Sequence, residues 1–237
     1  MTFSDKTVFL SAPTTLDLND SNSVLLLATF DINRFDNGLY DQFQIDKPDT
    51  LSKAVNKRQA EYLAGRALVQ HAFEHLKVDQ VQLPMGQDRA PIWPPGIHGS
   101  ISHTKGRVAC LLTKRPGHFV GIDIEKNLSE NGLKSVKQVT LQPSERDFVA
   151  QYTELPEPQL AGAIFSAKET LFKALYPIVQ RFFGFNAAAC IGVNDTTLRM
   201  ELTQDLHATL PIGRAFEVQM RLYDGHVLTW LLHDTTQ

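Results

Sequence analysis

Residues 119–125 read FVGIDIE, a short run dominated by the β-branched and aromatic side chains that favour β-strands. Successive side chains of a strand point to opposite faces, so Asp123 and Glu125 share one face while Ile122 and Ile124 face the core. Two neighbouring carboxylates suit Mg²⁺, which binds a few carboxylates together with waters and phosphate oxygens. The same alternation is typical of a strand with one solvated face, and the pattern alone leaves both interpretations open.

Toward the N-terminus, the sequence predicts three more strands and either one long helix or two. The strands are VLLLATF at 24–30, SISHT at 100–104 and VACLLT at 108–113. Apolar residues at helical spacing predict the helix over 51–76. Four prolines and three glycines in 83–99 exclude regular structure and predict a fixed loop. Residues 1–22 are expected to form an irregular lead-in with at most one short strand.

Toward the C-terminus, a similar order of elements is expected. A polar connection and a short helix near 143–152 precede a strong helix at 158–179. Strands are predicted at 197–202, 214–223 and 226–233, and Asp224-Gly225 predicts a hairpin between the last two. Both halves therefore offer a helix followed by antiparallel strands, which predicts an α/β fold of the α+β kind in two tightly packed lobes.

The composition excludes some classes of protein. A net charge of −3 and a pI near 6.2 argue against a nucleic-acid binder, because such proteins need a basic field. The early apolar run 24–30 is too short to span a bilayer or to form a signal peptide. The only two cysteines have no metal or disulfide spacing. We therefore expect a cytoplasmic protein with no integral membrane segment.

The helical stretch FSAKETLFKAL at 165–175 carries a second acidic candidate. Glu169 and Lys173 stand four residues apart on a flank of the buried stripe, so they share one face. Glu169 could serve as a third metal ligand or as a base, with Lys173 beside a phosphate. The alternative is an ordinary surface ion pair.

Two further groups could bind anions. Ser102 and His103 in GSISH could donate to a phosphate, or His103 could be structural; the lack of a G-x-S-x-G elbow disfavours a serine hydrolase. Arg58 and Arg66 in KRQAEYLAGR fall on nearly one helical face and could clamp phosphates, although surface arginines of this kind are common.

Taken together and in this order, the motifs resemble the surfactin-type 4′-phosphopantetheinyl transferases, and most closely the branch typified by enterobactin synthase component D. The matched stretches are KRQAEYLAGR, RAPIWPPGIHGSISHT, GIDIE and FSAKETLFKAL, which lie between residues 57 and 175. The resemblance favours the functional interpretation of the acidic residues. It does not extend to the segment before residue 57.

The resemblance implies a pseudo-twofold, two-lobe fold that binds coenzyme A and Mg²⁺ at the lobe interface. It implies lobes at 1–125 and 126–237, the second carrying the FSAKE helix. The implied metal ligands are Asp123, Glu125 and Glu169, and the implied catalytic residues are Glu169, Lys173 and His103. The implied coenzyme A contacts are Arg58, Arg66, Arg89, Ser102, His103, Lys168 and Lys173. Met85 departs from the family, whose members often carry a basic residue there.

The implied reaction moves the 4′-phosphopantetheine group of coenzyme A onto a serine of an apo carrier protein. The branch suggests peptidyl or aryl carriers of siderophore assembly, with fatty-acid or polyketide carriers as alternatives, and we expect a monomer. One rival is a non-catalytic carrier-binding protein of the same fold. Another is a metalloprotein built on His71 and His75, whose spacing permits a shared metal but lacks a clear third ligand.

Overall fold

The computed structural model describes residues 9–86 and 88–235, which belong to two compact units that divide after Gly117. The predicted boundary followed residue 125 and differs from this division. The cause is the strand β5 (His118–Lys126), which pairs along its whole length with β9 (His226–Asp234) near the C-terminus. The FVGIDIE strand therefore belongs to the second unit.

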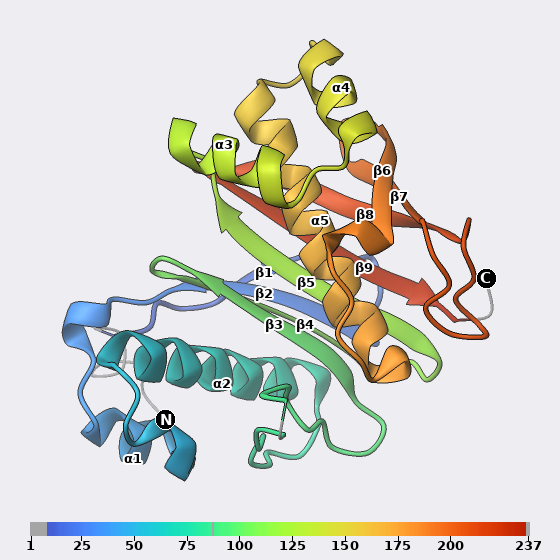
Figure 1. The fold of residues 1–237 in the computed structure, drawn as a ribbon. Coiled ribbons are helices and arrows are strands. Elements are labelled where there is room, and N and C mark those ends of the chain that lie inside the picture. The colour runs from blue at the N-terminus through green and yellow to red at the C-terminus, as the bar shows by residue number, and fades with distance from the viewer. Residues whose placement is uncertain (1–8, 87, 236–237) are drawn as a thin grey trace. The chain divides into compact units, whose positions relative to one another are not determined.

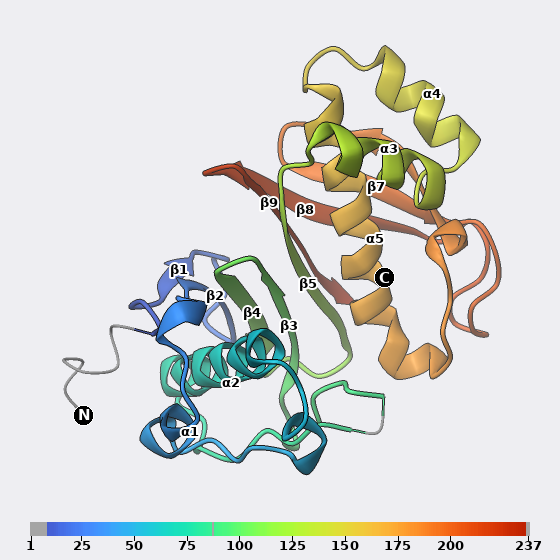
Figure 2. The same cartoon turned by 60° about the vertical axis from the view of Figure 1, so that its left-hand side comes forward.

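The first unit is a four-stranded antiparallel sheet with a long helix on one face (Figures 1 and 2). The strand order is β1-β2-β4-β3. Its strands are β1 (Thr14–Leu16), β2 (Ser23–Thr29), β3 (His98–Thr104) and β4 (Arg107–Thr113). Its helices are α1 (Gly38–Phe43) and α2 (Asn56–Leu76), with short 3₁₀ turns at Ile32–Arg34 and Asp49–Leu51.

The helix α2 packs its apolar residues on β2, β3 and β4. Leu63, Leu68 and Phe73 are fully buried there. Gly65 allows close packing, since a Cβ at this position would lie 3.2 Å from the Ile101 side chain of β3. The predicted strands and the long helix are confirmed in this unit. The proline-rich loop is irregular over its described residues up to Ile97, and β3 already begins at His98, inside the stretch that was expected to be irregular.

The second unit is a five-stranded antiparallel sheet crossed by the long helix α5 (Figure 1). The strand order is β5-β9-β8-β7-β6. The remaining strands are β6 (Ala188–Val193), β7 (Thr197–Leu202) and β8 (Ala215–Tyr223). The helices are α3 (Glu130–Val139), α4 (Pro143–Gln151) and α5 (Glu157–Val179), with a 3₁₀ turn at Phe185–Ala187.

The predicted hairpin between β8 and β9 is confirmed. Asp224 and Gly225 both have positive φ, 45° and 70°, as a two-residue turn that follows the twist of the strands requires. One helix and one strand of this unit were not predicted, and neither was α1 of the first unit. The helix α3 has few apolar residues and begins at the cap Ser129, which accepts from the Gly132 amide. The strand β6 is rich in alanine, which strands disfavour.

The mixed helix and antiparallel-sheet fold is thus the one expected from the sequence. Across the part of the chain that the structure describes, no helix combines the length and the apolar character needed to cross a membrane.

Candidate active site

Asp123 is a buried carboxylate on β5 that contacts α5 through both of its oxygens. Only 3% of the residue is exposed. The Ser166 hydroxyl donates to Oδ2 at 2.8 Å, and the Lys173 ammonium donates to Oδ1 at 2.7 Å. The same ammonium donates to the Ile122 carbonyl oxygen at 3.1 Å. Since an unpaired buried carboxylate would be costly, these contacts fix the position of Asp123 beneath the helix.

A chain of buried hydroxyl groups continues from this carboxylate into the sheet. Thr229 lies on β9 directly opposite Asp123 in register. Its Oγ1 is 2.9 Å from the Ser166 Oγ and 2.7 Å from the Thr170 Oγ1. Ser166, Thr170 and Thr229 are completely buried. The network holds α5 to two strands at the point where the carboxylate lies.

Gly121 permits this close approach of helix and sheet. A Cβ there would lie only 2.2 Å from the Thr170 carbonyl oxygen and 3.0 Å from the Ala174 Cβ, both on α5. Any larger residue would push the helix away from β5. The glycine of GIDIE therefore sets the distance at which Ser166 and Lys173 reach Asp123.

Glu169 is a half-buried acid on the same helix. Burial raises the pKa of its carboxyl, the neighbouring Asp123 carboxylate raises it further, and Lys173 opposes both effects. Two acids and one ammonium therefore share this region. An acid with a raised pKa can take up a proton near neutral pH more readily than an ordinary glutamate.

The structure does not bring the three predicted metal ligands together as a set. Glu125 is half-buried and shares the strand face of Asp123, and Asp123 raises the pKa of Glu169. Within residues 9–86 and 88–235, however, no three His, Cys, Asp or Glu side chains form a group that could hold a metal ion. The magnesium site therefore stays a prediction. Among those residues, His71 and His75 do not form such a group either. The His71 Nδ1 instead lies 3.5 Å from the Glu74 Oε2.

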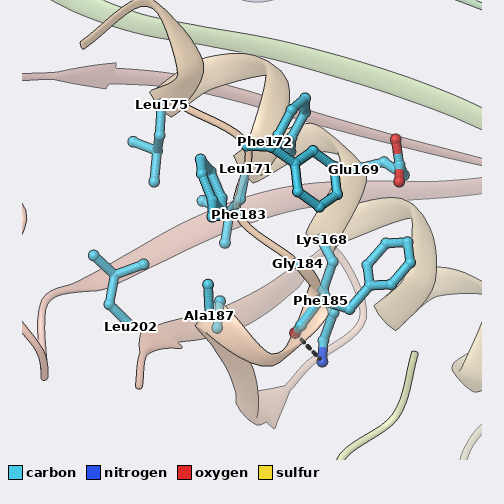
Figure 3. A pocket seen from close by; sticks show the side chains of 12 residues that line it. Lys168, Glu169, Leu171, Phe172, Leu175, Phe183, Gly184, Phe185, Ala187 and Leu202 are labelled. Carbon is cyan, nitrogen blue, oxygen red and sulfur yellow. Dashed lines mark hydrogen bonds between the residues drawn. The ribbon is translucent and has the colours of Figure 1, made fainter. Parts of the chain in front are cut away.

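An apolar pocket of about 180 Å³ lies beside Glu169 (Figure 3). Its lining comes from α5, from the segment that follows it and from β7. Phe182, at the edge of this segment, is exposed. The lining residues are Lys168, Glu169, Leu171, Phe172, Leu175, Phe182, Phe183, Gly184, Phe185, Ala187, Ala188 and Leu202. The pocket can accept a slender, largely apolar group whose end lies near a carboxylate.

Lys168 does not join Lys173. Its ammonium donates to the Glu145 carboxylate at 2.6 Å and to the carbonyl oxygens of Thr140 and Phe185, each at 3.0 Å. Figure 3 shows Lys168 pointing toward the Phe185 carbonyl while Glu169 leaves the helix in another direction. These three acceptors match the three N–H donors of a lysine. The expectation that Lys168 faces a phosphate disagrees with this arrangement, because its charge is already paired in the protein interior.

In the first unit, Arg58, Glu61 and His103 form a polar cluster between α2 and β3. The Arg58 Nη1 lies 3.2 Å from the His103 Nε2. Arginine can only donate, so Nε2 must accept, and the imidazole proton belongs on Nδ1. That nitrogen lies 3.8 Å from the Glu61 Oε1. The predicted pairing of Arg58 with His103 in one anion-binding region is compatible with this geometry.

The other predicted anion contacts of this unit differ in their surroundings. Ser102 is buried and, as the strand neighbour of His103, points to the opposite face of β3. Arg66 is buried against the Tyr62 ring at 4.4 Å, and its Nε donates to the Leu83 carbonyl at 2.9 Å. It therefore anchors the proline-rich loop through its Nε. Burial lowers the pKa of Arg66, and the nearby Arg58 lowers it further. Arg89 is exposed in that loop, at a positive φ of 67°.

Sequence reasoning missed Ser166, Thr170 and Thr229, which orient Asp123. A signal was present in the helix period, since positions 166, 170 and 173 fall on one face. That face carries two hydroxyl groups and a lysine. Thr229 had no such signal, because only the β5–β9 register brings it opposite Asp123.

Comparisons with known proteins agree with the motif pattern. Residues 47–113 match the family model of the 4′-phosphopantetheinyl transferase N-terminal domain, and residues 119–229 match that of the 4′-phosphopantetheinyl transferase superfamily. Enterobactin synthase component D of Salmonella typhimurium is 33% identical over 86% of this chain and 84% of its own length. The 4′-phosphopantetheinyl transferase Npt of Nocardia iowensis is 33% identical over 58% of this chain and 61% of its own. The transferase PptT of Mycobacterium tuberculosis is 29% identical over 62% of this chain and 64% of its own.

Proposed function

The chain belongs to the 4′-phosphopantetheinyl transferase superfamily, and from this premise we propose that it transfers 4′-phosphopantetheine from coenzyme A to a serine of an apo carrier protein. The serine oxygen forms a bond to the β-phosphorus of coenzyme A. The bond from that phosphorus to the bridging oxygen breaks, and adenosine 3′,5′-bisphosphate leaves. Catalysis of this kind depends on positioning and on charge stabilisation.

The observation that carries the proposal is the cluster of Asp123, Lys173 and Glu169, of which Glu169 also lines an apolar pocket. Lys173, held on Asp123 at 2.7 Å, supplies a fixed positive charge for a phosphate. Glu169, whose pKa is raised by burial and by Asp123, is suited to accept the serine proton. The apolar pocket beside Glu169 suits the pantetheine arm.

Magnesium dependence is part of the proposal. Two acids support it, because burial and the nearby Asp123 raise the pKa of Glu169 and carboxylates are the ligands that Mg²⁺ prefers. Asp123, Glu169 and Glu125 would hold it. When bound, it would supply charge neutralisation at the phosphates.

Arg58 and His103 are proposed to contact a phosphate of the same coenzyme A molecule. The supporting observation is the 3.2 Å contact that joins their side chains and orients the guanidinium. The prediction that residues of both units serve one active site stays a prediction. Peptidyl or aryl carriers of siderophore assembly are the proposed partners because of the similarity to enterobactin synthase component D, with fatty-acid and polyketide carriers as the comparison set.

The proposal is tested by incubating the protein with coenzyme A, Mg²⁺ and a panel of apo carriers, followed by intact mass spectrometry. The expected product is a carrier heavier by one phosphopantetheine group. Asp123→Ala should abolish transfer while the protein stays folded, whereas Asp147→Ala, which changes an exposed acid on α4, should leave it intact. Full transfer by Asp123→Ala at millimolar magnesium, or no transfer by the unaltered protein to any carrier, would refute the proposal.

A further inference from the structure

We propose that the buried ion pair between Lys168 and Glu145 positions the pocket loop, residues 182–188, and thereby holds the apolar pocket in the shape that accepts the pantetheine arm. The inference rests on the proposed transferase function. It assigns Lys168 and Glu145 as positioning residues whose charged groups do not bind the phosphates of coenzyme A.

The ion pair joins four separate segments of the second unit. Lys168 on α5 donates to the Thr140 carbonyl at the end of α3, to Glu145 on α4 and to the Phe185 carbonyl in the pocket loop. Glu145 extends the connection, since its Oε1 accepts from the Cys190 amide of β6 at 2.7 Å. One paired charge therefore fixes two helix ends, a loop and a strand.

Glu145 also organises the start of its own helix. Its Oε2 accepts from the Gln142 amide at 2.8 Å, and the Gln142 side-chain amide donates to the carbonyl oxygens of Asn186 and Ala188, each at 3.2 Å. The pocket loop is thus held at three carbonyl oxygens, those of Phe185, Asn186 and Ala188. All three accept from Lys168 or from Gln142, while Thr203 holds the Asn186 and Ala187 carbonyl oxygens independently of the pair.

Because the pair is buried, its role is to hold neighbouring segments in place and not to bind a ligand. The Lys168 and Glu145 side chains are 2% and 0% exposed, so neither charge can reach a phosphate without leaving its partner unpaired in the interior. Desolvation lowers the pKa of Lys168 and Glu145 opposes that effect.

The placement of the pair links it to the reaction. Lys168 precedes Glu169 in the chain, and both line the pocket together with Phe183 and Phe185. The Phe183 ring packs on Phe172 with centroids 4.9 Å apart, and the Phe185 ring packs on Phe165 at 5.7 Å. Releasing the loop would move these rings and change the pocket while leaving Asp123 and Lys173 in place.

The test compares two ligands of the purified protein by isothermal titration calorimetry. One is coenzyme A, which carries the pantetheine arm; the other is adenosine 3′,5′-bisphosphate, which lacks it. The variant is Lys168→Met/Glu145→Gln, because replacing both charges avoids the unpaired carboxylate that Lys168→Met alone would bury. We expect coenzyme A to bind about tenfold more weakly, which corresponds to a loss of about 1.4 kcal/mol of binding free energy at the pantetheine arm, and the bisphosphate to bind within about twofold.

Hydrogen exchange followed by mass spectrometry gives a second readout that does not depend on ligand. Amides in and beside the pocket loop should exchange faster in the double variant, while those of β5 and β9 should not change. The matched control is Lys134→Met, which removes an exposed lysine of α3 and should alter neither binding nor exchange.

The outcomes separate this inference from the proposed function. Equal weakening of both ligands would show that Lys168 contacts the phosphates and would overturn the positioning role. Unchanged coenzyme A affinity with unchanged exchange would also overturn it, with the transferase function intact. If the unaltered protein binds no coenzyme A, both proposals fall together.

Discussion

Replacing Ser166 by alanine tests whether the buried hydroxyl network orients Asp123. The substitution removes the donor to the Asp123 Oδ2, at 2.8 Å, and the 2.9 Å contact with Thr229. A hydrogen bond to a charged group contributes about 1.5–3 kcal/mol, and a buried acceptor left without its donor costs a similar amount. Thr229 keeps its contact with Thr170 at 2.7 Å. The expected loss in the free energy of unfolding is therefore about 2 kcal/mol, most of it from the carboxylate.

The assay is urea unfolding, in which the midpoint should fall while the slope against urea stays constant. Ser135→Ala, on the exposed face of α3, is the matched control and should stay within about 0.5 kcal/mol of the unaltered protein. Thr229→Val and the double variant complete a cycle, whose coupling energy should be non-zero because the two residues are in contact. A Ser166→Ala protein as stable as Ser135→Ala, with no coupling to Thr229, would refute the network.

Two further predictions concern the packing of α5 and the charge on Glu169. Gly121→Ala should cost about 3 kcal/mol or more of unfolding free energy, because the new Cβ would clash with the Thr170 carbonyl oxygen. Gly192→Ala is the control, since its Cβ would meet only the Arg199 Cβ at 3.9 Å, and thermal unfolding should show a far smaller cost. The folded protein binds a proton on Glu169 more tightly than the unfolded chain does, because the pKa of Glu169 is raised. This contributes stability that is fully present below the ordinary pKa of 4.5 and is lost as the pH rises through the raised pKa. The stability of Glu169→Gln relative to the unaltered protein should therefore increase from pH 4 to pH 7, as measured by urea midpoints, while transfer activity is lost. A stability difference that decreases over this range would contradict the assignment.

Local patterns predicted most of the strands and helices because each carries its own signal. The β8–β9 hairpin follows from Asp224-Gly225, which adopts the two positive φ angles that the turn demands. The helix α3 has no comparable signal; it carries an Asn-Gly pair and is mostly exposed, and its Val136 packs only once α5 is in place. Its existence depends on tertiary packing, which local composition does not encode.

The boundary between the units could not be predicted, because it depends on a long-range pairing. The FVGIDIE strand follows β4 after a short turn, which made it a natural last strand of the first unit. Its partner is instead β9, with Asp123 opposite Thr229. A strand is assigned to a unit by the neighbour that satisfies its backbone hydrogen bonds, and a sequence read in order does not reveal that neighbour.

The predicted site divides according to whether the geometry is local. Ser102 and His103 are neighbours on a strand, so their side chains had to point to opposite faces, and only His103 joins Arg58. Arg58 and Arg66 are about 80° apart around the helix axis at about 100° per residue. Because of that angle, Arg58 contacts His103 in the polar cluster, whereas Arg66 packs on Tyr62 and contacts the loop.

The same arithmetic separates the two lysines of FSAKETLFKAL. Five helical steps from Lys168 to Lys173 amount to about 500°, which leaves the two side chains about 140° apart. A single phosphate cluster beside α5 therefore cannot draw on both of them unless the helix is distorted there. Since Lys173 meets Asp123 at 2.7 Å, Lys168 has to serve another part of the structure. Its partner is Glu145, which stands 23 positions earlier in the chain and whose Oε2 lies 2.6 Å from the Lys168 Nζ. Helical spacing could not have indicated this pair. In the proposed enzyme, α5 carries Lys173 for the reacting phosphate and Lys168 for the wall of the pocket. Glu169 lines that pocket and has its pKa raised by burial and by Asp123, so it belongs to both regions.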